Sequence, residues 1–440
     1  MGESQTVNIE DDVKKVREIL EKDRNETIFV TDSQQILQGI ITVGDFSRKA
    51  DDVRNIAELM NKNHLKIEEP TDEKNKATSV EQTAREVFFQ NRARAQIREI
   101  PVVSNEGKLL YIIKKIKPAY ERTFFEISDI CNAKCTYCKK GKNNKSGNFV
   151  AQPQGKRKFV DLKEFKKSIE YMLSNSFIDS DTIIRLYRRG EPFLHPNFKE
   201  IVYCLDELEV PFWLSTNASN PIRFDEGDNR VLKHLRGLEF SVSGFSQESL
   251  GRIHGFDLDM IKKNIISITR NYRQAGFSGH AILRFHMYQF NLNEIKTAIE
   301  FAKNNDMEIS IYTAHFNDQD EFRKYVKNEL GYAELKLAGE ELLLYAINKR
   351  LKEYHDLYKG ENKYYCPELD ILSIDENCNV VTCCGDSADV YMKIYDVETV
   401  DEINSWRESS KLCKECIGSG MTYTAHNPFT YQDMFGETIS

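Results

Sequence analysis

The chain has 440 residues, of which 40% are hydrophobic and 30% are charged. One hydrophobic core rarely serves a chain of this length, so we expect two or three domains in a globular protein. The formal net charge of −8 argues against a general affinity for nucleic acid. No apolar run is long enough for a membrane span, and the first residues lack the features of a secretion signal. We therefore expect a cytoplasmic protein with neither a nucleic-acid nor a membrane partner.

The ten cysteines are unevenly distributed along the chain. Three lie within residues 131–138, six lie within residues 366–416, and Cys204 stands alone. This is not the cysteine density of a small disulfide scaffold. Clustered cysteines in a chain without a secretion signal are more often metal ligands than disulfides. The sequence therefore predicts two metal centres.

Residues 1–118 contain no cysteine and are predicted to form a separate module with an internal repeat. The predicted elements are a helix over 11–22 with strands over 27–30 and 39–42, then a helix over 80–91 with strands over 100–103 and 109–113. The same order of helix, strand, turn and strand occurs twice, which is typical of a duplicated unit.

This repeat resembles a pair of α+β CBS domains. The resemblance lies in Gly39-Ile40-Ile41-Thr42-Val43-Gly44-Asp45 and in Ile100-Pro101-Val102-Val103 with Gly107. It implies that Thr42 and Asp45 hold the ribose of an adenine nucleotide, since a carboxylate can accept from both ribose hydroxyls. Lys114 and Lys117 take these positions in the second repeat, so at most one such site is expected. The alternative is that the module serves only domain packing or a homodimer contact.

Residues 119–320 alternate between predicted strands and helices. The strands are expected over 124–127, 182–185, 211–215, 237–242, 281–286 and 308–312, with helices over 161–174, 198–208 and 293–304 among them. Such alternation predicts an α/β fold with parallel strands and crossover helices. Six units predict a partial (β/α)6 barrel of the TIM type, with the active site at the carboxyl ends of the strands.

The rest of the chain is predicted to hold two shorter regions. Residues 321–365 are expected to be a charged helical connector. Residues 366–440 are short, cysteine-rich and poor in apolar periodicity, so we expect a small C-terminal domain that needs metal to fold.

The first cysteine group, Cys131, Cys135 and Cys138, directly follows the strand at 124–127. Three thiolates on one loop can hold three irons of a [4Fe–4S] cluster and leave the fourth open to a substrate. Zinc is the competing metal, but it usually takes a fourth cysteine or histidine nearby. No other cysteine or histidine lies between residues 64 and 195.

With its Cys-x3-Cys-x2-Cys spacing, this group resembles the motif of the radical SAM superfamily. The resemblance implies that the open iron binds S-adenosylmethionine (SAM) and that an electron from the cluster cleaves it to a 5′-deoxyadenosyl radical. Arg189-Gly190-Glu191-Pro192 resembles the family motif that holds the methionine amino group. Gly190 would permit close backbone approach and Glu191 would accept from the ammonium. The family commonly has a second glycine where Arg189 stands.

Further cofactor-binding residues are implied by their order at the strand ends. Ser215, Asn217, Ser241 and Ser243 are placed to bond ribose or carboxylate, Arg284 to meet the carboxylate, and Tyr137 to stack near adenine. The alternative for each is an ordinary polar residue at the end of a strand, or simple packing for Tyr137.

The second cysteine group resembles the SPASM extension of radical SAM enzymes. The resemblance implies one auxiliary [4Fe–4S] cluster on Cys366, Cys383, Cys413 and Cys416. A structural zinc site is the alternative. The family usually has glycine where Cys378 stands. Cys384 is predicted as a hydrogen-atom donor in catalysis, and Cys204 as a buried apolar residue on a helix.

The substrate prediction depends on basic residues near the first cysteine group. These are Lys139, Lys140, Lys142, Lys145, Lys156, Arg157 and Lys158, with Arg188 and Arg189. They favour a phosphate-bearing substrate, and the alternative for this loop is a merely solvated surface. CBS-type modules resemble the N-terminal parts of some sugar-nucleotide transferases, and this resemblance implies a small phosphorylated or nucleotide-linked metabolite, such as an activated sugar. The alternatives are a peptide or protein maturase and an adenine-nucleotide sensor with an inert barrel. Flavodoxin or ferredoxin is the expected electron donor.

Overall fold

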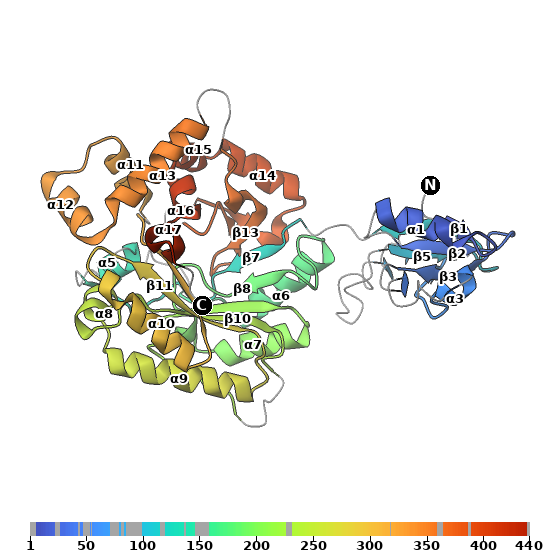
Figure 1. Cartoon of the computed structure of the whole chain (residues 1–440), viewed down its shortest axis with the longest axis horizontal. Helices are drawn as coiled ribbons and strands as arrows, with labels where there is room; N and C mark the ends of the chain where they lie inside the picture. Colours follow the sequence, from blue (N-terminus) through green and yellow to red (C-terminus); the bar gives the residue numbers. More distant parts are fainter. Residues whose placement is uncertain are drawn as a thin grey trace. The chain divides into compact units, whose positions relative to one another are not determined.

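A computed structural model describes most of the chain, which divides into two compact units, Met1–Lys117 and Pro118–Ser440 (Figure 1). The described residues are 6–22, 27–42, 45–46, 53, 55–70, 79–80, 83–84, 99–114, 119–135, 138–145, 158–225, 231–316, 318–358, 364–385 and 389–437. Tyr137, Lys117, most of the predicted helix 80–91 and residues 146–157 of the basic loop lie outside them.

The first unit contains two three-stranded sheets of the same design. The strands are β1 (Thr6–Asn8), β2 (Ile28–Thr31) and β3 (Leu37–Ile41), then β4 (Ile67–Glu68), β5 (Glu99–Val103) and β6 (Leu109–Lys114), with helices α1 (Val13–Lys22) and α3 (Ile56–Leu59). In each sheet the first strand is parallel to the second, and the second is antiparallel to the third. The register shifts between Val30 and Thr31 in one sheet and between Val102 and Val103 in the other. The predicted internal repeat is therefore present in the strand pairing.

The second unit is built on one nine-stranded sheet. Its strands are β7 (Arg122–Phe125), β8 (Ile183–Arg185), β9 (Phe212–Thr216), β10 (Leu235–Ser241), β11 (His280–Met287), β12 (Glu308–Thr313), β13 (Ile371–Ile374), β14 (Asn379–Val381) and β15 (Val390–Lys393). Strands β7 to β12 lie in chain order and pair in parallel throughout. The large parallel sheet predicted from the alternating pattern is thus present.

The cysteine-rich C-terminal section extends this sheet. Strand β13 pairs in parallel with β7, and the β13–β14 hairpin and β15 continue outward with antiparallel pairing. The section predicted as a small domain of its own therefore shares main-chain hydrogen bonds with the first strand of the parallel sheet.

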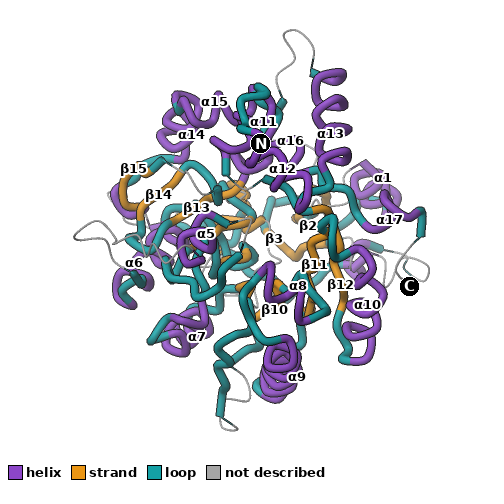
Figure 2. The backbone as a smooth tube through the Cα atoms, turned by 90° about the vertical axis from the view of Figure 1, so that its left-hand side faces the viewer, coloured by secondary structure: helices purple, strands orange, loops and turns teal. Residues whose placement is uncertain are grey.

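Helices connect the parallel strands and cover one face of the sheet (Figure 2). They are α5 (Lys139–Lys145), α6 (Leu162–Ser174), α7 (Phe198–Glu207), α8 (Gln247–Ile253), α9 (Leu258–Gln274) and α10 (Ile295–Asn304), with 3-10 turns η2 (Pro192–Leu194) and η4 (Leu292–Glu294). Asp161 caps α6 and Asp257 caps α9, each accepting from main-chain N–H groups of the first turn. None of the described helices is long and apolar enough to cross a membrane.

The C-terminal third is mostly helical between its strands. It contains α11 (Gln319–Val326), α12 (Tyr332–Glu341), α13 (Leu344–Leu357), η5 (Pro367–Asp370), η6 (Ile394–Asp396), α14 (Val400–Ser409), α15 (Lys411–Gly418), α16 (Met421–His426) and α17 (Tyr431–Phe435). The first three correspond to the helical connector predicted over 321–365.

Side chains alternate between the two faces of the parallel strands. On β11, Leu283 and Phe285 are buried in the core shared with α10, whereas Arg284 and His286 are half-buried on the opposite face. A strand places successive side chains on opposite faces, so apolar residues line the helix side and polar residues the other side.

Candidate functional site

The loop that carries the first three cysteines runs from the end of β7 to the start of α5. The side-chain amide of Asn144, on α5, donates to the carbonyls of Cys131 (2.9 Å) and Ala133 (2.8 Å). A Cβ on Gly141 would lie 2.3 Å from the backbone N and O of Cys135, so α5 packs on this loop backbone to backbone. The three thiols are therefore held by a fixed main-chain frame.

The surroundings of the first cysteine group favour thiolates bound to iron over free thiolates. Cys131, Cys135 and Cys138 are each partly exposed as residues. Burial of the Cys131 sulfur, and then the nearby Glu191 carboxylate, raises the pKa of this thiol to about 12. Such a thiol is not ionised at neutral pH without a positive partner, which iron supplies as it takes a thiolate ligand.

The loop after β8 lies against the cysteine loop. A Cβ on Gly190 would come within 1.7 Å of the carbonyl oxygen of Ser128, so only glycine fits there. The Glu126 carboxylate accepts from the main-chain N–H groups of Arg189 (3.0 Å) and Gly190 (3.0 Å). The Gly190 position predicted from the sequence is thus explained by close backbone approach.

Glu191 lies beneath the cysteine loop and joins it to the end of β9. Its carboxylate accepts from the Thr216 hydroxyl (2.7 Å) and from the main-chain N–H groups of Asn217 (2.8 Å) and Phe193 (3.1 Å). Burial raises its pKa to about 7, against the opposing effect of these three hydrogen bonds. The carboxylate predicted to accept from an ammonium therefore also supports the loop, and Thr216 is a partner that the sequence did not reveal.

Asn217 links the end of β9 to the first cysteine. Its side-chain amide donates to Asn132 Oδ1 (3.1 Å) and approaches Cys131 Sγ at 3.8 Å. The predicted residue Asn217 thus lies beside a candidate cluster ligand.

The other predicted strand-end residues differ in their surroundings. Ser215 and Ser241 are half-buried, outside the helix-side core. Ser243 is fully buried, and its hydroxyl hydrogen-bonds His286 Nδ1 (2.9 Å) and accepts from the main-chain N–H of His286 (3.1 Å). Ser243 therefore links β10 to β11, and the ribose or carboxylate contact expected of it stays a prediction.

Arg284, the residue predicted to meet the SAM carboxylate, has partners within the sheet. Its guanidinium contacts the buried Glu239 carboxylate at 2.5 Å and donates to the Tyr312 hydroxyl (3.1 Å). The indole of Trp213 donates to the same carboxylate at 2.5 Å. Arg284 therefore neutralises a buried acid inside the sheet, and a second anion would have to share it.

His254 is a further residue of the site. It follows α8, is 2% exposed, and places Nδ1 3.2 Å from Cys135 Sγ and Nε2 3.2 Å from the main-chain N–H of Ser243. Burial lowers its pKa to about 4, so the imidazole is neutral at pH 7. It lies 119 residues from Cys135 in sequence, and no spacing pattern links the two.

Four of the described basic residues near the cysteine loop are paired with carboxylates. Lys140 contacts Asp129, Lys142 lies 2.7 Å from Glu321, and Arg188 lies 3.1 Å from Glu126. Arg189 also lies 3.7 Å from both Glu126 and Asp129. These cations balance a buried acidic trio, Glu126, Asp129 and Glu376, whose oxygens lie within 4.8 Å of one another.

The second cysteine group comes together from three elements. Cys366 precedes η5, Cys383 follows β14, and Cys413 and Cys416 lie one turn apart on α15. Burial raises the pKa of Cys366 and Cys416 to about 12 and that of Cys383 to about 11, and charge on neighbouring thiols of the group adds to each shift. The thiols therefore lie within electrostatic reach of one another.

Arg407 fixes the frame of this group. It is fully buried, and its guanidinium donates to the carbonyls of Leu369 (3.2 Å), Ile371 (3.0 Å) and Val381 (3.3 Å). It thereby ties α14 to the segments that carry Cys366 and Cys383. A buried arginine in a charged helix has no sequence signal of its own, so this residue was missed.

The three remaining cysteines, Cys204, Cys378 and Cys384, differ in their surroundings. Cys378 is fully buried at a φ of 64°, in the left-handed region that favours glycine, within the β13–β14 turn. This explains why glycine suits the position, and it indicates that Cys378 is a structural residue of the turn. Cys204 is buried on α7, as predicted. Burial, then the Glu368 carboxylate, raises the pKa of Cys384 well above its ordinary value, so its sulfur keeps its proton at neutral pH.

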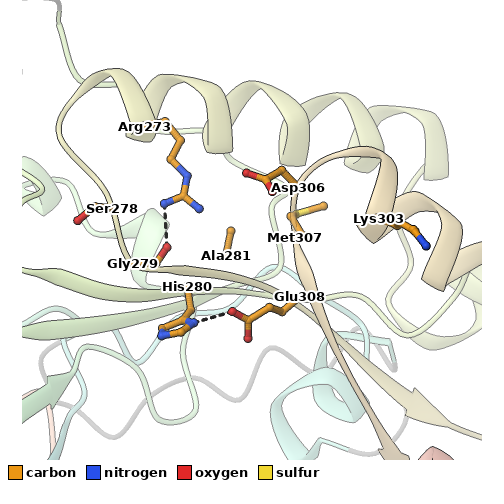
Figure 3. Close-up of a pocket in the computed structure, with 9 residues that line it drawn as sticks. All are labelled: Arg273, Ser278, Gly279, His280, Ala281, Lys303, Asp306, Met307 and Glu308. Atoms are coloured by element: carbon orange, nitrogen blue, oxygen red, sulfur yellow. Dashed lines mark hydrogen bonds and ion pairs between the residues drawn. The ribbon is translucent and has the colours of Figure 1, made fainter. Parts of the chain in front are cut away.

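A separate pocket of about 490 Å³ lies at the amino ends of β11 and β12 (Figure 3). Its lining includes Arg273, His280 and Glu308, with His280 Nδ1 2.6 Å from the Glu308 carboxylate. The cysteine loop follows the carboxyl end of β7, so in a parallel sheet this pocket belongs to the other end.

In the first unit, Thr42 and Asp45 form one turn after β3. The Asp45 carboxylate accepts from the Thr42 main-chain N–H (3.0 Å) and hydroxyl (2.7 Å). Lys114, the repeat-related residue, instead lies 3.3 Å from the buried Glu99. The two halves of the repeat therefore differ at this position, as expected.

In comparisons with known proteins, the matches to the chain are solved structures. No family model and no curated protein matches the chain. SuiB of Streptococcus suis bound to precursor peptide SuiA is 14% identical over 70% of this chain and 73% of its own, with a TM-score of 0.42. The structure of anSMEcpe with bound AdoMet and Cp18Cys peptide is 13% identical over 69% of this chain and 83% of its own, with a TM-score of 0.41.

A shorter match is CBSX2 in complex with AMP, which is 19% identical over 25% of this chain and 80% of its own, with a TM-score of 0.18. These proteins are of the two kinds that the sequence resembles, radical SAM enzymes and, for the N-terminal region, CBS-domain proteins. Their TM-scores lie below 0.5, so they carry no weight for the chemistry of this site.

Proposed function

We propose that the chain is a radical SAM enzyme with its centre at Cys131, Cys135 and Cys138. The observation that carries the proposal is the meeting of this three-thiol loop with the Gly190–Glu191 loop and the end of β9. When bound there, a [4Fe–4S] cluster with one open iron would bind SAM and supply the electron that cleaves it to a 5′-deoxyadenosyl radical, which abstracts a hydrogen atom from the substrate. Strands β7 to β12 would form the partial (β/α)6 barrel around this centre.

The residues of the chain orient and enclose the centre. Asn144 and Gly141 hold the main chain of the loop at Cys131 and Cys135. Glu191 and Asn217 hold the loop after β8 and the end of β9 against it. Ser215 and Ser241, half-buried at the strand ends, are the proposed contacts of the SAM ribose or carboxylate.

We further propose that Cys366, Cys383, Cys413 and Cys416 hold one auxiliary [4Fe–4S] cluster. Their mutual effect on thiol ionisation and their frame around Arg407 support this assignment. Cys384 adjoins Cys383, and its protonated thiol fits the proposed role of hydrogen-atom donor. Zinc in place of the auxiliary cluster would appear in a metal analysis.

A SAM-dependent spectrum tests the SAM site directly. Protein reconstituted with iron and sulfide under anaerobic conditions is reduced with dithionite, and its EPR spectrum is recorded with and without SAM. A change on adding SAM is expected, because the open iron gains the SAM amino and carboxylate groups as ligands. An EPR spectrum that does not change when SAM is added would contradict the proposal.

The substrate class needs a separate experiment. The prediction of a phosphorylated or nucleotide-linked metabolite relied on cations that the structure pairs with carboxylates, such as Lys140, Arg188 and Arg189. Cell extract is therefore divided by ultrafiltration, and each fraction is added to the enzyme with SAM and reductant. Stimulation of 5′-deoxyadenosine release by the small-molecule fraction would support a metabolite, and stimulation by the large fraction a peptide or protein.

A second proposal concerns the first unit, where Thr42 and Asp45 share one turn. We propose that this turn binds the ribose of an adenine nucleotide. Calorimetric titration with ATP and AMP should give binding in the wild type and none in Asp45→Ala. Absence of binding in both would leave the unit with a packing or dimer role.

A further inference from the structure

His254 is held rigidly between the cysteine loop and the end of β10. Its main-chain N–H donates to the carbonyl of Leu250 (2.8 Å), and its own carbonyl accepts from the N–H of Lys134 (2.9 Å). Gly255 follows with a φ of +78°, and a Cβ there would lie 3.1 Å from the Lys134 side chain. The main chain of His254 is therefore held against the cysteine loop.

The partners of the imidazole decide where its hydrogen lies. The main-chain N–H of Ser243 can only donate, so Nε2 of His254, 3.2 Å away, must be the accepting nitrogen. A neutral imidazole then carries its hydrogen on Nδ1, which lies 3.2 Å from Cys135 Sγ. A thiolate bound to iron has no proton and can only accept, so the arrangement matches a donor to an acceptor.

We propose that His254 donates a hydrogen bond from Nδ1 to the Cys135 thiolate and thereby raises the reduction potential of the cluster bound there. The proposal rests on the proposed function, since it needs a cluster at Cys135. A hydrogen bond to a ligand sulfur withdraws charge from the cluster, and this favours the reduced form, which carries one more electron. His254 is thus a positioning residue that acts through a ligand.

The neighbours of His254 favour this role. Ser243, which fixes Nε2, is itself held by His286 and by the Asn291 side chain, which donates to the Ser243 carbonyl (2.6 Å). The same ring thus accepts from the Ser243 main-chain N–H on one side and faces Cys135 Sγ on the other.

The test compares His254→Phe and His254→Gln with the wild type as reconstituted holoenzyme. The EPR signal that responds to SAM identifies the cluster, and its amplitude is followed in a potentiometric titration. We expect His254→Phe to disfavour reduction about tenfold, or about 59 mV for a one-electron couple. His254→Gln retains a donor and should recover part of the shift. His234→Phe, which removes a buried histidine 3% exposed outside the site, should leave the potential unchanged.

A second measurement keeps the test decisive if His254→Phe fails to bind iron. Pulsed EPR of the reduced wild type labelled with 15N-histidine should show a weakly coupled nitrogen that disappears in His254→Gln. An unchanged potential in the iron-bound variants, or a strong coupling that marks His254 as an iron ligand, would overturn the proposal. A wild-type protein without any SAM-responsive signal would instead refute the proposed function.

Discussion

The hydroxyl of Thr216 donates a 2.7 Å hydrogen bond to the buried carboxylate of Glu191. This bond joins the loop after β8 to the end of β9. Both segments contact the three-thiol loop, since Asn217 approaches Cys131 Sγ and the backbone of Gly190 packs against Ser128. The proposed SAM site therefore depends on close backbone packing as much as on its ligands.

Replacing Gly190 with alanine should displace this packing. The added Cβ would meet the Ser128 carbonyl oxygen at 1.7 Å, a contact that only backbone movement can relieve. We expect Gly190→Ala to fold but to lose most iron at the first centre, as measured by iron content after reconstitution. Gly251→Ala on α8 is the matched control, since its Cβ would meet only the flexible Gln247 amide at 3.6 Å. Full iron retention in Gly190→Ala would show that the cysteine loop does not need the close backbone contact between Gly190 and Ser128.

Arg407→Met should destabilise the segments that carry the second cysteine group. The change removes three hydrogen bonds to main-chain carbonyls and leaves those buried carbonyls without a charged donor. We expect the free energy of unfolding to fall by about 3 kcal/mol and the auxiliary metal to be lost, while the first centre remains. Denaturant unfolding and iron analysis measure both effects. Arg323→Met, at an exposed pair with Asp320, should change neither.

The sequence predicted the parallel sheet because its strands are short apolar runs separated by amphipathic helices. The predicted strand 308–312 and helix 161–174 differ from β12 and α6 by one residue at most. The cysteines, Gly190 and Glu191 were found because their spacing is local. His254, Thr216 and Arg407 were missed because each acts through a contact with a distant part of the chain. The side-chain partners of Ser243 and Arg284 could not be predicted either, since they come from neighbouring strands.

Substitutions of Cys366 and Cys378 should distinguish a metal ligand from a structural cysteine in the C-terminal section. Cys366→Ala should lose the auxiliary metal, because it removes one of four thiols from a shared centre. Cys378→Gly should retain it, because glycine adopts the φ of 64° without strain and the sulfur serves packing only. Iron and zinc analysis of the purified variants measures the difference. Metal loss in Cys378→Gly would place Cys378 among the ligands.

The stability of the second unit should fall as the pH rises through Glu376. Burial, and then the carboxylates of Glu126 and Asp129, raises the pKa of Glu376 from 4.5 to about 7. Between these values the folded chain holds a proton that the unfolded chain has released, so folding is favoured at the acid end and loses this contribution above pH 7. Glu376→Gln mimics the protonated acid and should flatten the fall in melting temperature between pH 5 and pH 8. An equal slope in both proteins would contradict the assignment.

The most direct measurement is the release of 5′-deoxyadenosine from SAM by reconstituted, dithionite-reduced protein. The account predicts release by the wild type, release by Cys378→Gly, and none by Cys135→Ala, whose chain lacks one of the three thiols of the first centre. Absence of release from wild-type protein that carries a full complement of iron and sulfide, or undiminished release from Cys135→Ala, would contradict it.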